Sequence, residues 1–113
     1  MMRDNSLFIK DILDAIEKIE AFIGCLDFEE FITDDKTASA VVRKLEIIGE
    51  ASKNIPKSVK QGYELPWKDM AGMRDKISHE YFGVDLEIVW KVIKEKLPEI
   101  KPVVRKMLAE IKK

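Results

Sequence analysis

The chain has 113 residues, 46% of them hydrophobic and 36% charged, which is enough for one hydrophobic core and not for two. Twenty Lys and Arg against 21 Asp and Glu give a formal net charge of −1, and this excludes binding to nucleic acid through overall positive charge. One cysteine and one histidine exclude an internal disulfide and a structural metal site. No segment has the roughly 20 apolar residues of a membrane span, so we expect a soluble, cytoplasmic protein with one domain over residues 1–113.

The first part of the chain has the periodicity of an amphipathic helix over residues 5–23. The residues that set this period are Ile9, Ile12, Ile16, Ile19 and Ile23. Gly24 ends the helix, and a short helical turn is expected near residues 27–31. The sequence Thr-Asp-Asp at 33–35 supplies an N-cap for a second long helix, which runs to about residue 54 and is stopped by Pro56.

Residues 56–65 are expected to form a connector with one irregular turn. Pro66 suits the first position of a third helix, which runs to about residue 79. Gly83 lies beyond the end of this helix.

Asp85 can cap the last helical region, whose apolar residues continue on one face to residue 111. A kink or break is expected around Pro98 and Pro102, because proline cannot donate the backbone hydrogen bond of a helix. No segment alternates with the period of two that a half-buried strand requires. The sequence therefore predicts an all-α fold, an up-down bundle of four or five helices.

Charge is distributed unevenly along the chain. Residues 1–35 carry 3 basic and 10 acidic side chains, residues 36–90 carry 9 and 8, and residues 91–113 carry 8 and 3. Two interpretations stay open: the charges cover solvated helix faces, or the basic end guides a polyanion toward a site.

Two residues in the third helix stand out for their chemistry. His79 is the only histidine, and Arg74, five residues earlier, is one of four arginines in a chain that otherwise uses lysine. On a regular helix these positions lie about 140° apart and do not share a face. If they act together, either the helix bends or a second copy of the chain supplies the complementary residue. A homodimer with a shared cleft is the natural solution.

These residues also carry a resemblance to a known family. Residues 73–85 (MRDKISHEYFGVD), followed by Val-Trp at 89–90, resemble the Arg-x4-His-x-Tyr signature of the HepT-like (DUF86) branch of the HEPN superfamily. Residues 43–51 (RKLEIIGEA) resemble a segment of that family's second helix, and Pro-Trp at 66–67 resembles the entry to its third helix. The similarity covers nearly the whole chain.

The resemblance implies a dimeric helical-bundle ribonuclease that uses no metal or other cofactor. It also implies a toxin whose antitoxin partner is a small MNT-type nucleotidyltransferase. Arg74 and His79 match the family's catalytic pair, and Tyr81 matches the tyrosine that the antitoxin modifies with AMP. Asp75 departs from the Asn that is common after the Arg in the superfamily.

The residue types suit RNA cleavage, because RNA carries its own nucleophile, the 2′-hydroxyl. A metal-free nuclease needs a base for that proton, an acid for the departing 5′-oxygen, and a cation beside the phosphate. The imidazole of His79 can serve as base or acid, and the guanidinium of Arg74 can hold phosphate oxygens. We expect a product with a 2′,3′-cyclic phosphate.

The alternative from another class is a non-catalytic helical adaptor that dimerises and binds the nucleotidyltransferase as an accessory subunit. A helix-turn-helix regulator is poorly supported, because no short helix carries a concentrated basic face. Cys25 is expected to be a small buried residue beside Gly24.

Overall fold

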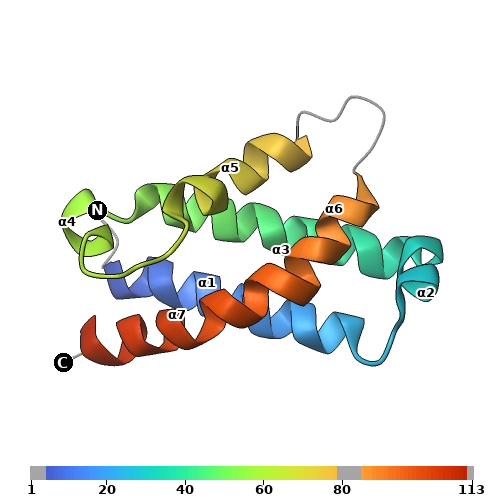
Figure 1. Cartoon of the computed structure of the whole chain (residues 1–113), viewed down its shortest axis with the longest axis horizontal. Helices are drawn as coiled ribbons and strands as arrows, with labels where there is room; N and C mark the ends of the chain where they lie inside the picture. Colours follow the sequence, from blue (N-terminus) through green and yellow to red (C-terminus); the bar gives the residue numbers. More distant parts are fainter. Residues whose placement is uncertain (1–4, 79–84, 112–113) are drawn as a thin grey trace.

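The computed structural model describes residues 5–78 and 85–111, and for residues 74–78 it describes the backbone alone. The described residues form helices and no strand (Figure 1). In chain order the elements are α1 (Asn5–Ile23), α2 (Phe28–Thr33), α3 (Asp35–Asn54), α4 (Lys57–Lys60), α5 (Trp67–Ser78), α6 (Leu86–Lys91), the π-helical turn η1 (Val92–Lys96) and α7 (Leu97–Ile111). The segment α6–η1–α7 is continuous, so α1, α3, α5 and this segment run alternately up and down the molecule. The predicted all-α, up-down bundle is confirmed.

Side-chain caps begin the helices where the sequence places them. At α2 the Asp27 carboxylate accepts a hydrogen bond from the Glu30 backbone N–H (2.8 Å), and Glu30 Oε1 accepts one from the Asp27 N–H (3.1 Å). At α3 the Asp34 carboxylate accepts from the Thr37 hydroxyl (2.7 Å) and from the Thr37 N–H (3.1 Å). These two hydrogen bonds, the hydroxyl's first, lower the pKa of Asp34.

The turn between α1 and α2 differs from the sequence expectation at one residue. Gly24 has a φ of +52°, a left-handed conformation that ends α1. Cys25 follows it and is exposed, so the expectation of a buried cysteine is wrong. The reason is that Cys25 belongs to the connection and not to the apolar face of either helix.

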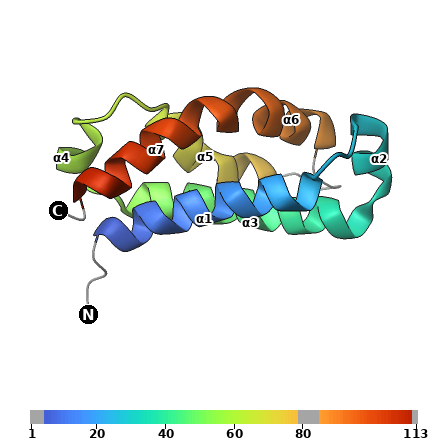
Figure 2. The same cartoon turned by 90° about the horizontal axis from the view of Figure 1, so that it is seen from below.

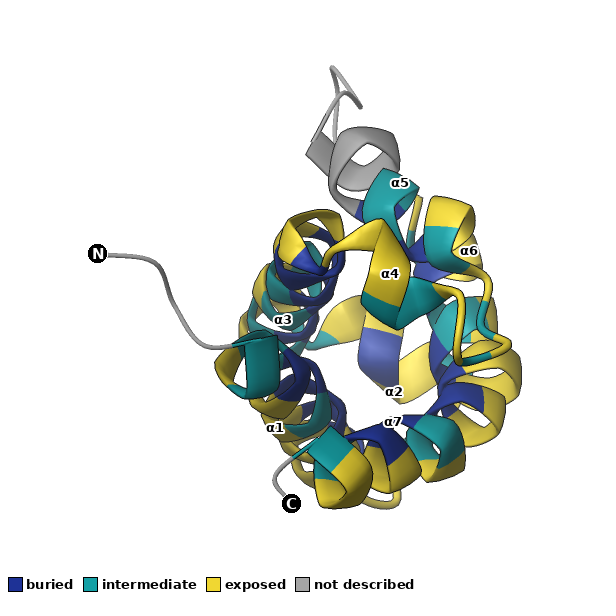
Figure 3. Ribbon diagram, turned by 90° about the vertical axis from the view of Figure 1, so that its left-hand side faces the viewer, coloured by how far each residue is buried: buried dark blue, intermediate teal, exposed yellow. Residues whose placement is uncertain are grey.

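The core lies along the inward faces of the long helices, which Figure 3 shows in dark blue. Helix α1 packs against α3 and α7, and α3 packs against α5 (Figures 1 and 2). The largest fully buried side chains are Phe31, Ile9, Ile12, Ile16, Ile19, Leu45, Ile48, Met70, Met107, Val41, Val89 and Val104. Each such residue contributes about 1.5–3 kcal/mol of apolar burial. Among the residues that the structure describes, no helix is both long and apolar enough to cross a bilayer.

The last helical segment changes its geometry just before Pro98. In η1 the Leu97 N–H donates to the Val92 carbonyl, five residues back, where an α-helix would use the fourth. In α-helical geometry the ring of Pro98 would meet the carbonyl of residue 94, and the wider turn relieves this contact. The expected irregularity therefore lies at residues 92–96, and α7 continues through Pro102 without interruption.

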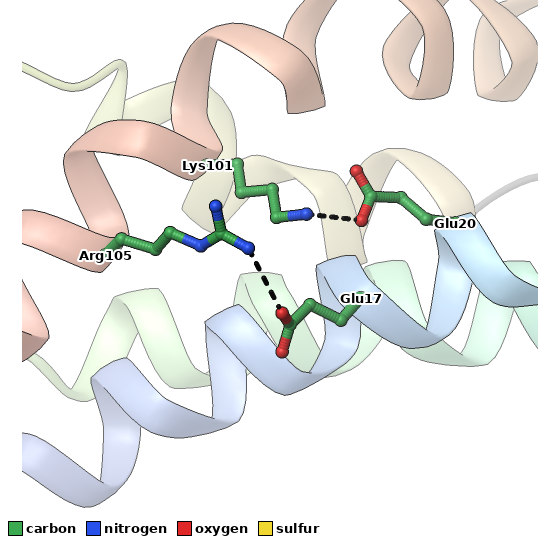
Figure 4. Close-up of polar contacts among 4 residues, drawn as sticks. All are labelled: Glu17, Glu20, Lys101 and Arg105. Carbon is green, nitrogen blue, oxygen red and sulfur yellow. Dashed lines mark hydrogen bonds and ion pairs between the residues drawn. The ribbon is translucent and has the colours of Figure 1, made fainter.

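The acidic start and the basic end of the chain meet at the contact between α1 and α7 (Figure 4). Lys101 Nζ lies 2.6 Å from Glu20 Oε1, and Arg105 Nη2 lies 3.5 Å from Glu17 Oε2. Pairs as exposed as these contribute about 0–1 kcal/mol each. Part of the charge asymmetry along the sequence is therefore used within the fold, and fewer basic groups of α7 remain for a polyanion.

Candidate functional site

Helix α5 carries Arg74, and its first turn is fixed by the connector that precedes it. Trp67 Nε1 donates a hydrogen bond to the Tyr63 carbonyl (3.2 Å), and Lys60 Nζ lies 5.6 Å from the centre of the Trp67 ring. The Tyr63 hydroxyl donates to Glu110 Oε1 on α7 (2.6 Å), and this hydrogen bond raises the pKa of Tyr63. Through Tyr63, the start of α5 is therefore connected to the C-terminal end of α7.

Position 74 comes directly after two core residues of α5. Met70 precedes it by four residues, which is about 40° around the helix, and Met73 is its neighbour in sequence. Met70 is fully buried and Met73 is 9% exposed, so the part of α5 just before Arg74 packs on the bundle.

Two of the predicted site residues, His79 and Tyr81, lie outside the described residues, as does Gly83. For Arg74 the backbone is described and the side chain is not. The pairing of Arg74 with His79 therefore stays a prediction.

The chain after this segment returns at Asp85, which caps α6 as predicted. Its carboxylate accepts hydrogen bonds from the backbone N–H groups of Glu87 (3.0 Å) and Ile88 (3.3 Å). Residue 85 is thereby held at the entry to α6, directly beyond the segment that contains His79 and Tyr81.

An aromatic cluster fixes α6 against α2. The ring centre of Trp90 lies 5.2 Å from that of Phe31, which is fully buried, and 5.9 Å from that of Phe28. Lys94 Nζ lies 4.9 Å from the Trp90 ring centre. Helix α5 packs on α3 and α6 is held on α2, so the two helices on either side of residues 79–84 both contact the rest of the bundle. Sequence periodicity does not reveal this cluster, because it joins residues about 60 positions apart.

A cavity of about 620 Å³ lies between α5 and the α6–η1–α7 segment. Its lining residues are Glu64, Leu65, Pro66, Lys68, Asp69, Met70, Gly72, Met73, Ile88, Val92, Lys96, Glu99 and Ile100. We refer to it as the α5–α7 groove. Its floor is apolar and its rim is charged, and it reaches Met73, the residue before Arg74. The sequence offered one signal for it, a glycine at position 72 inside a helix.

Metal ligands are not grouped in the part of the chain that the structure describes. Within residues 5–78 and 85–111, no three His, Cys, Asp or Glu side chains are placed to hold a metal ion together.

Comparison with known proteins gives matches over almost the whole chain. The family model described as "Ribonuclease HepT-like" matches residues 12–107, a range that includes Arg74, His79 and Tyr81. A Thermococcus cleftensis protein named "Probable ribonuclease HepT" is 52% identical over 89% of this chain and 93% of its own length.

Two further relatives carry RNase names. One from Methanocaldococcus jannaschii, a "Putative RNase", is 46% identical over 96% of this chain and 91% of its own length. Another of that name, from Caldanaerobacter subterraneus subsp. tengcongensis, is 42% identical over 93% of this chain and 95% of its own length. No solved structure matches the chain significantly. The family match and these identities together place the chain in the ribonuclease HepT-like family, as the resemblance of its motif indicated.

Proposed function

We propose that this chain is an endoribonuclease that cleaves RNA without a metal ion, using Arg74 and His79. The observation that carries the proposal is the family match over residues 12–107, which spans both residues, together with relatives that bear ribonuclease names. The structure has Arg74 in α5, within the matched range and directly after the core residue Met73.

The proposed reaction is an internal transesterification. One imidazole takes the proton of the 2′-hydroxyl, the 2′-oxygen attacks phosphorus, and a second imidazole, protonated, gives its proton to the departing 5′-oxygen. The products are a 2′,3′-cyclic phosphate and a free 5′-hydroxyl. Arg74 holds the phosphate oxygens and stabilises the added negative charge, which its planar guanidinium does better than an ammonium group.

The proposed enzyme is a homodimer, since each chain has only one histidine. A two-fold cleft between two copies contains two imidazoles and two guanidinium groups, enough for a base, an acid and two phosphate ligands. The separation of about 140° between positions 74 and 79 on a regular helix also favours residues contributed by two chains.

We further propose that the enzyme is the toxin of a toxin–antitoxin pair and that its partner is an MNT-type nucleotidyltransferase. In the proposed modification, the Tyr81 hydroxyl oxygen attacks the α-phosphorus of ATP, pyrophosphate leaves, and the phenolic proton is released. The bound AMP adds bulk and negative charge beside the substrate phosphate, and both oppose RNA binding. Intact-mass measurement after incubation with ATP and this partner tests the step, and a Tyr81→Phe variant that is still modified and silenced would refute it.

An RNA cleavage assay in the presence of excess EDTA tests the nuclease. The wild-type chain should cut a mixed RNA substrate and leave cyclic phosphate ends, and Arg74→Ala and His79→Ala should each lose at least about 100-fold in rate. Arg105→Ala is a matched control, because it removes an arginine that is 58% exposed on α7. Circular dichroism checks that each variant is folded. Undiminished cutting by His79→Ala would contradict the proposed mechanism, and a wild-type chain that cuts nothing would contradict the nuclease and favour the non-catalytic adaptor.

A further inference from the structure

We infer that the α5–α7 groove is the face on which a second copy of this chain sits, so that the two-fold axis passes close to the end of α5 that carries Arg74. The inference rests on the proposed function, since a shared active site requires a second copy, and it names the surface that would bring the copies together. Three features of the groove carry it.

The first feature is Gly72, which lines the groove in the middle of α5. A glycine in a helix interior is less favourable than an alanine, so it needs a reason. A Cβ atom built at this position meets no atom within 4 Å, and nothing within the described chain therefore crowds the backbone here. An approach by another backbone from outside the chain would use the space that the missing side chain leaves.

The second feature is that one face carries both a projection and a hollow. Ile88 lines the groove and is 45% exposed, the highest value among the large apolar side chains that the structure describes. Met70, Met73 and Ile100 form a buried floor beside it. In a two-fold interface each copy presents the same patch, so a face with both shapes can fit itself: Ile88 of each copy enters the other's hollow. Methionine side chains adapt readily to such an insertion.

The third feature is the rim, which carries charges of both signs. Lys68 and Asp69 lie on α5, and Lys96 and Glu99 lie on the opposite wall. None of the four forms an ion pair with another residue of the described ranges, in contrast to the paired groups between α1 and α7. With Glu64 the rim has three acidic and two basic groups, which does not suit a polyanion such as RNA. A mixed rim can pair with its own copy across the two-fold axis.

The test uses variants that leave the single chain folded and act only on the interface. Gly72→Gln places a long side chain where the structure has open space, and it replaces glycine by a better helix former, so the isolated chain should melt no lower than the wild type. Ile88→Lys removes the exposed apolar projection. Ala109→Gln introduces the same glutamine at an exposed position of α7, away from the groove, and serves as the control.

Sedimentation velocity over a range of protein concentrations measures the dimer directly. We expect the wild type and Ala109→Gln to dimerise with the same dissociation constant, and Gly72→Gln and Ile88→Lys each to weaken the dimer at least tenfold while keeping their helical circular dichroism. A wild-type chain that is monomeric, or groove variants that dimerise like the wild type, would overturn the inference.

RNA cleavage is measured separately on the same samples. A dimer that depends on the groove but does not cut RNA would refute the proposed nuclease and leave the interface in place. A dimer that cuts RNA and is insensitive to both groove variants would refute only the interface.

Discussion

Replacing Trp90 by leucine should show how much the aromatic cluster contributes to holding α6 beside the proposed site. The change removes two ring contacts, at 5.2 and 5.9 Å, and the contact with Lys94 at 4.9 Å. Aromatic pairs contribute about 0.5–1.5 kcal/mol each and an exposed cation–π contact about 0.5–1 kcal/mol. Because these contributions are not strictly additive, we expect the free energy of unfolding to fall by about 2–3 kcal/mol.

Thermal unfolding followed by circular dichroism measures this loss. An unfolding entropy of about 2.1 cal/mol/K per residue gives about 0.24 kcal/mol/K for 113 residues, so the midpoint should fall by about 10 °C. A double-mutant cycle with Phe31→Leu isolates the ring pair and should give a coupling of about 0.5–1.5 kcal/mol. A loss below about 0.5 kcal/mol for Trp90→Leu, or a coupling of zero, would show that the cluster does not hold α6 as the contacts indicate.

Three further predictions follow from single contacts. Lys101→Ala should cost at most about 1 kcal/mol in urea unfolding, and the cost should vanish near about 1 M salt; a loss that is independent of salt would contradict a surface ion pair. The pKa of Asp34 is lowered on folding, so its stabilisation is present above pH 3.8 and is lost as pH falls through the folded-state pKa. The melting temperature of Asp34→Ala should therefore lie below that of the wild type at pH 7 and approach it in acid. A difference in melting temperature that does not change with pH would contradict a stabilising role for the ionised Asp34 carboxylate. The pKa of Tyr63 is raised, so its stabilisation is present below pH 10 and is lost as pH rises through the folded-state pKa. Tyr63→Phe should lack this alkaline loss, which a pH series of melting curves can detect.

Local signals in the sequence predicted the helices and their caps well. The isoleucines of α1 recur so regularly that both ends of the predicted helix, residues 5 and 23, agree with the structure. A cap within residues 33–35 and a cap at Asp85 could be predicted, because a carboxylate before an apolar-periodic segment needs no distant partner; the structure shows that Asp34 is the residue that caps α3.

The features that depend on distant parts of the chain could not be predicted in the same way. Trp90 meets Phe31 only because α2 and α6 are brought together by the bundle, and the α5–α7 groove exists only because α5 packs on α3 and not closely on α7. The π-helical turn is an intermediate case. The buried residues Val89, Ile93 and Leu97 are spaced by four and four, which suits a wider turn, although the same spacing also occurs in α-helices.

The candidate site likewise combines a feature that local sequence predicts with one that it does not. Arg74 was predicted to lie in the third helix, and the structure has it in α5. Whether Arg74 meets His79 depends on the position of residue 79 and on a second copy of the chain, neither of which a helical period determines.

A mixing experiment tests most directly whether two copies of the chain share one active site. Wild-type chain and His79→Ala are unfolded together, refolded at a fixed total concentration, and assayed for RNA cleavage in EDTA at several wild-type fractions. If catalysis needs both imidazoles of a dimer, activity follows the square of the wild-type fraction and falls to about a quarter in an equal mixture. Activity that falls in direct proportion, to about a half in that mixture, would mean that each chain cuts alone and would contradict the shared site.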